Sequence, residues 1–279
     1  MTLHRIAFFT LAAALFAQAP LASARSLAEV QTAQTINVVT TAGGPPHGFL
    51  NPESNQLEGI MVDVSQALAK KLGVKLNLSS VPFAGLIPTL TSGRVDLMSA
   101  PLFITEERAR VIDFSTPVYE WGEGLVAGTR STKQIKNFDD LKGSKIGVLV
   151  DSVQFKMIKD MPDTKVSTYP DYVTLLSDVR AGRIELGIVD PPSVLYQIKS
   201  KNIPGVKMVE GYQPQRVWQV GLAVEKGNAE LLAAVNKGIA EMKANGELAA
   251  IGQKWGVSEL LSKMTPAPHD ADRSAAWIS

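Results

Sequence analysis

The feature that most constrains this sequence is an alternation of strand-like and helix-like segments from residue 36 to about residue 255. Residues 36–40 are rich in β-branched side chains, which predicts a strand. Residues 61–72 place Val64, Leu68 and Leu72 on one helical face, and Gly73 follows as a stop. The remaining predicted elements are strands 74–78, 95–99, 145–150, 165–168, 184–189 and 219–224 and helices 83–92, 152–159, 171–181, 192–199, 227–244 and 246–254. This alternation is typical of an α/β fold.

A short internal echo indicates two similar halves. The segments SGRVDL at 92–97 and AGRIEL at 181–186 each end a predicted helix at glycine and open a strand that ends at proline. Two such halves predict two lobes, and open α/β sheets bind ligands at the carboxyl ends of their strands. We therefore expect a cleft between the lobes to hold a small-molecule site.

The ends of the chain carry their own signals. Residues 1–24 have a short basic start, an apolar run from residue 6 to 21, and an Ala-Ser-Ala cleavage site at 22–24, which predicts a secretory signal peptide. The alternative is a membrane anchor, but the interrupted run is shorter than the ~20 residues that a span requires. We expect an exported, periplasmic protein, with a flexible tail at 266–279.

Residue counts exclude several classes of protein. The 28 Lys and Arg residues against 27 Asp and Glu give a net charge of +1, which leaves no basic surface for nucleic acid. The absence of cysteine excludes disulfides, thiolate zinc sites and a lipidated N-terminal cysteine. Only His47 of three histidines lies in the predicted folded chain, so a histidine-rich metal site is excluded. Since no glycine-rich phosphate loop follows a strand, we expect neither metal nor cofactor.

One candidate site residue follows the first echo. Thr105 is a good helix N-cap, Glu106 and Glu107 suit the first turn, and Arg108 lies one turn in. Free N–H groups at a helix start and an arginine beside them could together bind a carboxylate. The alternative is a capped surface helix in which Arg108 pairs with a glutamate.

A second candidate lies at the matching strand end of the other half. Asp190 could accept hydrogen bonds from an ammonium group, although Asp-Pro-Pro could also simply start a turn. The pairing is more informative than either residue alone. A cation on one lobe and an anion on the other would bind a zwitterion.

The aromatic residues allow two interpretations. Phe83 and Phe103 could stack on a ligand or belong to the core, whereas Trp121 and Trp218 lie near the expected crossings and suit packing between lobes. His47, in a loop rich in glycine and proline, is better explained as a structural residue or pocket rim than as a general base.

At this point the sequence resembles the periplasmic solute-binding proteins of polar amino-acid ABC transporters, which are bacterial extracellular solute-binding proteins of family 3. The resemblance covers nearly all of 36–256. It is carried by LEGIMVD at 57–63, FAGLIPTL at 83–90, SGRVDL at 92–97, ITEER at 104–108, DFSTPVY at 113–119, DLKG at 140–143, GLAV at 221–224 and KGN at 226–228. Each motif is weak alone, but their order and spacing are specific.

The resemblance implies a two-lobed clamshell with hinge crossings near 125–130 and 217–222. Lobe one would comprise 25–126 plus 221–265, and lobe two 127–220. Such a protein is a monomer without enzymatic activity that captures an amino acid or related zwitterion and delivers it to a membrane permease. The family pattern assigns the ligand carboxylate to Arg108, the ligand ammonium to Asp190, and stacking to Phe83.

Other expected ligand contacts depart from the family pattern. The loop before Ile104 carries Ala100, Pro101 and Phe103, and Phe103 replaces a hydroxyl residue that commonly donates to the carboxylate. Pro101 has no N–H to donate. The lobe-two loop keeps Ser152 but has Val153 where the family has another hydroxyl. These departures predict a drier carboxylate side and favour a less polar amino acid or a derivative with a cyclic or bulky body.

The alternative function is that of an enzyme on the same scaffold. Periplasmic cyclohexadienyl dehydratases resemble these binding proteins and need a general acid in the cleft. Glu120, Glu123 and His47 are the candidates here, and none lies in a recognisable catalytic motif.

Overall fold

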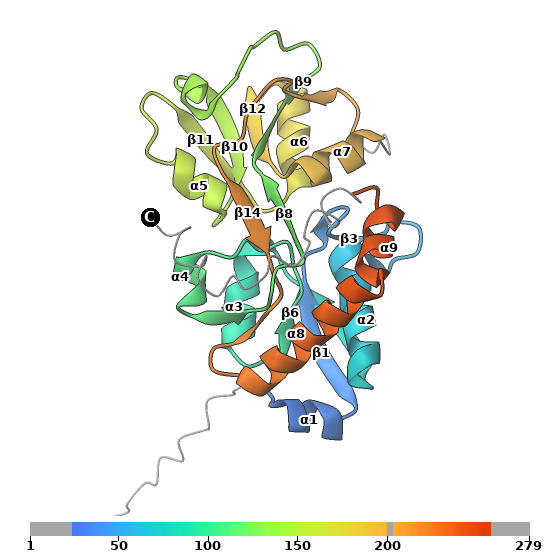
Figure 1. Cartoon of the computed structure of the whole chain (residues 1–279). Helices are drawn as coiled ribbons and strands as arrows, with labels where there is room; N and C mark the ends of the chain where they lie inside the picture. Colours follow the sequence, from blue (N-terminus) through green and yellow to red (C-terminus); the bar gives the residue numbers. More distant parts are fainter. Residues whose placement is uncertain (1–23, 200–202, 258–279) are drawn as a thin grey trace, which may run out of the picture.

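The computed structural model describes residues 24–199 and 203–257 and has two sheet-containing lobes flanked by helices, which confirms the predicted fold class (Figure 1). Residues 1–23 and 258–279 lie outside the described residues. They hold nearly all of the predicted signal peptide and the whole of the predicted tail. No helix in the described part of the chain has the length and apolarity needed to cross a membrane.

The first lobe is built on a five-stranded sheet in the order β5-β1-β6-β15-β7. β1 (Thr35–Thr40) runs parallel to β5 (Lys75–Ser80) and β6 (Leu97–Met98). β15 (Ala223–Glu225) returns from the far end of the chain and runs antiparallel to β6 and β7 (Ile112–Phe114).

Helices cover both faces of this sheet because side chains alternate along β1. Val38 packs with residues of α2 and α8, whereas Val39 packs with residues of α3. The helices of this lobe are α1 (Leu27–Thr32), α2 (Ile60–Leu72), α3 (Leu86–Thr91), α4 (Glu106–Ala109), α8 (Ala229–Ala244) and α9 (Glu247–Lys254), with a 3₁₀ turn η1 (Phe83–Gly85) before α3. As predicted, α2 ends at Gly73, whose φ of 72° is left-handed.

The second lobe repeats this plan with the order β11-β10-β12-β9-β13. β10 (Lys145–Leu149) is parallel to β11 (Lys165–Tyr169) and β12 (Leu186–Val189), and β9 (Gly124–Gly128) is antiparallel to β12 and β13 (Val206–Met208). The helical elements of this lobe are η2 (Phe138–Leu141), α5 (Val153–Ile158), α6 (Tyr172–Ala181) and α7 (Pro191–Lys199). A Cβ at Gly187 would lie 2.6 Å from Leu175, so glycine allows α6 to pack closely on the sheet.

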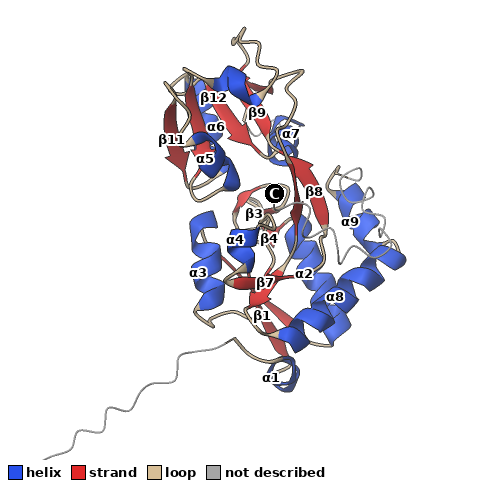
Figure 2. Cartoon of the chain, turned by 60° about the vertical axis from the view of Figure 1, so that its left-hand side comes forward, coloured by secondary structure: helices blue, strands red, loops and turns tan. Residues whose placement is uncertain are grey.

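Two antiparallel strands connect the lobes (Figure 2). β8 (Tyr119–Gly122) leads from the first sheet into the second, and β14 (Val217–Val220) leads back. Their register places Trp121 opposite Trp218, which agrees with the predicted packing of these residues between lobes.

Three sequence predictions need correction here. The expected single strand 219–224 is two strands, β14 and β15, because residues 221 and 222 separate pairing with β8 from pairing with β6 and β7. Residues 124–126, expected in lobe one, belong to β9 and pair within the second sheet. The first crossing therefore lies at 119–122, earlier than the expected 125–130.

A small three-stranded sheet on the first lobe forms part of the wall that faces the second lobe. It consists of β2 (Gly43–Gly44), β3 (Gly48–Leu50) and β4 (Leu57–Glu58). The sequence predicted only a loop around His47. Strands as short as β2 and β3 give no recognisable pattern in a segment rich in glycine and proline.

Candidate functional site

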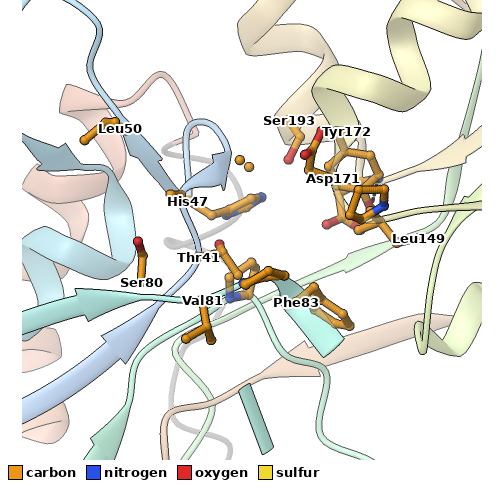
Figure 3. A pocket seen from close by; sticks show the side chains of 17 residues that line it. Thr41, His47, Leu50, Ser80, Val81, Phe83, Leu149, Asp171, Tyr172 and Ser193 are labelled. Carbon is orange, nitrogen blue, oxygen red and sulfur yellow. Dashed lines mark hydrogen bonds between the residues drawn. The ribbon is translucent and has the colours of Figure 1, made fainter. Parts of the chain in front are cut away.

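A cavity of about 390 Å³ lies between the two lobes, with side chains from both lobes in its wall (Figure 3). Several of these residues directly follow parallel strands: Thr41 follows β1, Val81 follows β5, and Asp190 follows β12. The carboxyl ends of both sheets thus face the cavity, which is where open α/β sheets bind ligands. This is the cleft that the internal echo predicted.

Arg108 is a buried cation at one edge of the site. It lies in α4, capped by Thr105, and only 7% of its surface is exposed. Its guanidinium donates to the carbonyl oxygen of Phe103 at 2.9 Å and to that of Asp151 at 3.2 Å, and it lies 5.8 Å from the Phe83 ring centroid. Burial lowers the pKa of Arg108 to about 10, which leaves it charged at neutral pH.

Arg108 has no ion pair with any carboxylate of the described residues, so the predicted alternative of a pair with glutamate does not occur there. Glu106 pairs with Arg110, and Glu107 pairs with Lys156 of the second lobe. A buried cation without an anion is costly, since burial favours neutral or paired groups. Arg108 can therefore bind an anion.

Asp190 is a buried anion in the cavity wall. It is 5% exposed, and one carboxylate oxygen accepts from the Trp121 indole N–H at 2.9 Å and from the Gln154 amide at 3.3 Å. Burial raises the pKa of Asp190 to about 6, although hydrogen bonds from Trp121, Tyr172 and Gln154 oppose this. Its partners are neutral, so its charge remains available to a cation.

His47 lies in the cavity wall with its ring fully buried. The ring stacks on Trp121 with centroids 4.7 Å apart, and Nδ1 lies 2.9 Å from the Tyr119 hydroxyl. Burial lowers the pKa of His47 to about 3, so the imidazole is neutral at physiological pH. A neutral imidazole can donate or accept one hydrogen bond at Nε2, but it carries no charge for the ligand.

Only some of the predicted ligand residues line the cavity. Phe83, Pro101 and Asp190 line the cavity, and Arg108 lies beside Phe83. The other predicted ligand residues, Phe103, Ala100, Ser152 and Val153, are not among the lining residues.

Each of those four has a structural role. The ring of Phe103 packs between Trp121 and Trp218, and its backbone bridges to Val220 of β14. Ala100 is in the core of the first lobe. Ser152 caps α5, its hydroxyl donating to the Leu149 carbonyl at 2.7 Å and accepting from the Phe155 N–H at 3.0 Å.

Val153 packs against the first-lobe core across the interface between lobes. Asp151 has a left-handed φ of 57°, and its carbonyl accepts the hydrogen bond from Arg108. Aspartate is among the residues that adopt this conformation most readily. The loop 151–153 therefore meets the first lobe through its backbone and apolar side chains.

Several lining residues were missed by sequence reasoning. Thr41, Tyr172 and Ser193 all line the cavity, and the Tyr172 hydroxyl accepts from the Asp190 N–H at 3.2 Å. Thr41 could have been found as the residue after the first strand, and Ser193 as the residue one turn after Asp190. Asp171 also lines the cavity, where it caps α6 by accepting from the Thr174 N–H at 2.8 Å.

A second cavity, of about 730 Å³, includes Trp121, Glu123 and Trp255 in its lining. The Glu123 carboxylate accepts from the Tyr212 hydroxyl and from the N–H groups of Gln215 and Arg216. The smaller cavity is the better candidate site because unpaired charges lie in or beside it. In the described residues, no cluster of histidine and acidic side chains could hold a metal ion.

Comparison with known proteins gives consistent results. The family model of bacterial extracellular solute-binding proteins, family 3, matches residues 36–258. The L-cystine-binding protein TcyJ of Escherichia coli (strain K12) is 35% identical over 212 residues, covering 76% of this chain and 78% of TcyJ.

Two solved structures resemble the whole two-lobed fold. An ancestral arginine-binding protein bound to arginine is 36% identical with a TM-score of 0.74, covering 80% of this chain and 98% of that one. AncCDT-1, an ancestral amino acid-binding protein and a precursor of cyclohexadienyl dehydratase, is 29% identical with a TM-score of 0.75, covering 82% and 98%. Since the family model spans most of the sequence and these relatives share its fold, the chain belongs to the bacterial extracellular solute-binding proteins of family 3.

Proposed function

We propose that this protein captures an amino acid or a related zwitterion between its lobes and delivers it to the permease of an ABC transporter. The observation that carries the proposal is a buried Asp190 in the cavity wall with only neutral partners, together with a buried Arg108 that has no ion pair in the described residues and lies beside the cavity-lining Phe83. A ligand with both charges would pair both groups at once. Export to the periplasm and action as a monomer are part of the same proposal, and family membership supports the export.

The mechanism is capture without covalent chemistry. The ligand carboxylate binds the guanidinium of Arg108, its ammonium binds Asp190, and its apolar part contacts the Phe83 ring. Charge-assisted hydrogen bonds of this kind contribute ~1.5–3 kcal/mol each. Two of them contribute ~3–6 kcal/mol. A micromolar constant needs about −8 kcal/mol, so burial of the ligand's apolar part has to supply the remainder and offset the cost of closing the lobes.

We also propose that the lobes move about β8 and β14. The first lobe would comprise 24–118 with 221–257, and the second 123–216. Contacts across the interface support a closed arrangement: Arg108 reaches the Asp151 carbonyl, Lys156 pairs with Glu107, and Gly43 packs against Asp171. Closure shifts the population toward the form that the permease recognises.

We propose a non-enzymatic role, although AncCDT-1 is a precursor of an enzyme. The geometry of the candidate acids supports this choice. Glu123 is committed to Tyr212 and the backbone of 215–216, Glu120 does not line the cavity, and the pKa of His47 is lowered to about 3. Incubation with prephenate or arogenate should yield no aromatic product, and turnover that requires one of these residues would refute the assignment.

Calorimetry over a panel of amino acids tests the binding function. A ligand should bind in the micromolar range or tighter, and Arg108→Ala should lower its affinity at least ~10-fold, the loss of roughly one charged hydrogen bond. A thermal-shift screen of amino acids, opines, ectoine-type osmolytes and betaines finds the ligand first, because a bound ligand raises the melting temperature. Unchanged affinity in Arg108→Ala would refute the proposed site.

A further inference from the structure

Three buried side-chain atoms in the cavity wall have no hydrogen-bond partner: Thr41 Oγ1, His47 Nε2 and Ser193 Oγ. Thr41 is 7% exposed, and His47 and Ser193 are fully buried. The large majority of buried side-chain polar atoms in folded proteins are hydrogen-bonded. Three exceptions in one cavity wall indicate that this wall receives a hydrogen-bonding group.

The three atoms come from both lobes and belong to residues that line the same cavity. Thr41 and His47 belong to the first lobe, and Ser193 lies in α7 of the second lobe. Figure 3 shows the His47 ring extending from the first lobe toward Tyr172 and Ser193 across the cavity. Stacking on Trp121 and the contact with the Tyr119 hydroxyl hold the ring in this orientation, so Nε2 is fixed in place.

The space beside Thr41 is open because of Gly44. A Cβ at Gly44 would have Thr41 Oγ1 as its nearest neighbour, 3.9 Å away. At Gly48, by contrast, a Cβ would lie 2.7 Å from the Thr41 carbonyl oxygen. The glycine at position 44 therefore leaves room for a ligand group to approach the Thr41 hydroxyl.

The charges around these atoms argue against an anionic partner. His47 is neutral because burial lowers its pKa to about 3. No lysine or arginine is among the residues that line the cavity, so a buried anion would lack a counter-charge here. Among the described residues, the acids in the wall are Asp190, which the proposed function assigns to the ligand ammonium, and Asp171, whose carboxylate caps α6 through the Thr174 N–H and hydroxyl. A cationic ligand side chain is therefore the competing occupant, and the ligand comparison below tests it.

We propose that Thr41, His47 and Ser193 form a specificity subsite for an uncharged hydrogen-bonding group, a hydroxyl or carboxamide, at the end of the ligand side chain. This inference rests on the proposed function, in which Arg108 and Asp190 bind the charged groups. It replaces the less polar ligand that the sequence departures at 100–103 and 151–153 favoured. Those departures remove expected donors to the ligand carboxylate, whereas Thr41, His47 and Ser193 supply three polar atoms elsewhere in the cavity wall.

The first experiment compares ligands of nearly equal shape by calorimetry: threonine with valine, asparagine with leucine, and glutamine with methionine. In at least one pair the polar member should bind 10-fold tighter or more, because its absence leaves the subsite atoms unpaired. Apolar members that bind as well or better in every pair would overturn the inference. Tighter binding of lysine, arginine or glutamate than of all these ligands would also overturn it.

The second experiment uses Thr41→Val and Ser193→Ala. Each removes a buried hydroxyl that has no partner in the protein, so the melting temperature of the free protein should stay the same or rise. Affinity for the tightest polar ligand should fall about 5- to 10-fold, the effect of one hydrogen bond, while affinity for its apolar counterpart should not fall. A structural role would lower the melting temperature instead.

Thr40→Val is the matched control. The Thr40 hydroxyl is equally buried and unpaired, but Thr40 does not line the cavity. The control should therefore bind the polar ligand as the unaltered protein does. Equal affinities for the polar ligand in Thr41→Val, Ser193→Ala and Thr40→Val would overturn the subsite. A loss of affinity in Arg108→Ala in the same series would still uphold the proposed function. If Arg108→Ala binds the ligand with unchanged affinity, or if the protein binds no amino acid at all, both the subsite and the proposed function are overturned.

Discussion

A single methyl group added at Gly43 should hinder closure of the lobes without changing the folding of either lobe. Its hypothetical Cβ would lie 2.8 Å from the Cβ of Asp171 in the opposite lobe. Carbon atoms in good contact are ~3.5–4.0 Å apart, so Gly43→Ala requires the lobes to separate by roughly 0.7–1.2 Å at this point. Asp171 cannot give way cheaply, because its carboxylate is held at 2.8 Å by both the N–H and the hydroxyl of Thr174.

The cost of this clash can be estimated from core overpacking, which destabilises by about 1–3 kcal/mol per inserted group. The clash exists only when the lobes are closed, so it should weaken ligand binding about 5- to 150-fold. Folding of the separate lobes should not change, since the glycine has no positive φ that an alanine would strain. Calorimetry gives the affinity, and small-angle scattering should show a more open liganded state.

Gly128→Ala is the control for this prediction. Gly128 does not line the cavity, and a Cβ there would meet no atom closer than the Val179 carbonyl oxygen at 3.6 Å, an ordinary contact. The variant adds the same methyl group, so its affinity for ligand should stay within about 3-fold of the unaltered protein, a difference of less than 1 kcal/mol. If Gly43→Ala binds as tightly as Gly128→Ala, the bound lobes do not approach as closely as in this structure, and the reasoning fails.

Three further predictions concern the charged groups. Arg108→Lys should lose nearly as much affinity as Arg108→Ala by calorimetry, because an ammonium cannot reproduce the planar fork of N–H donors. Affinity should be highest above pH 6 and fall as the pH drops below it, because protonation neutralises Asp190, whose pKa is raised to about 6; a flat titration would contradict this. Glu107→Gln, which breaks an exposed pair with Lys156, should change affinity less than 5-fold and only at low salt, since exposed pairs contribute at most about 1 kcal/mol.

The strand ends at the site were predictable because their signals are local. Periodicity and glycine stops located α2, α6 and the strands after them, and this was enough to place Asp190 and Phe83 in a common cleft. The place of Arg108 on a short capped helix was predictable for the same reason, since Thr105 caps that helix through a hydrogen bond between neighbours.

The positions of the lobe crossings and the burial of Phe103 were not predictable, because both depend on contacts between segments far apart in sequence. The Phe103 ring is buried by Trp218, and the Ile104 N–H donates to the Gln219 carbonyl, more than a hundred residues away in sequence. A phenylalanine near a strand end suits a ligand wall or a core equally well. Only the position of β14 decides between these roles.

The unpaired hydroxyl groups of Thr41 and Ser193 in the cavity wall were missed for a different reason. Thr41 and Ser193 are common residue types, and Ser152 is another serine near the cleft, yet only Ser152 has its hydroxyl paired on both sides within its own loop. Whether a hydroxyl is satisfied depends on every neighbour that burial brings, and these come from both lobes. The sequence could predict that a cavity lies between the lobes, but not which polar atoms of its wall remain without a partner.

The two charged residues explain how closure can depend on the ligand. Burial lowers the pKa of Arg108 to about 10 and raises that of Asp190 from 3.8 to about 6. Each shift of roughly two units means that the charged form is disfavoured by about 3 kcal/mol in the closed arrangement. For Asp190, whose folded pKa lies above its unfolded value, the free protein should lose stability as the pH rises from about 4 through 6.

Asp190→Asn should abolish that loss and raise the melting temperature of the free protein at pH 7, while it weakens binding at least ~10-fold by removing a charged acceptor. The same burial that costs stability makes the closed state unfavourable until a zwitterion supplies both opposite charges. A ligand can shift the lobes only by its differential affinity for the closed form. If Asp190→Asn instead lowered both the melting temperature and the affinity, the carboxylate would be a structural group, and the coupling of closure to charge pairing would have to be abandoned.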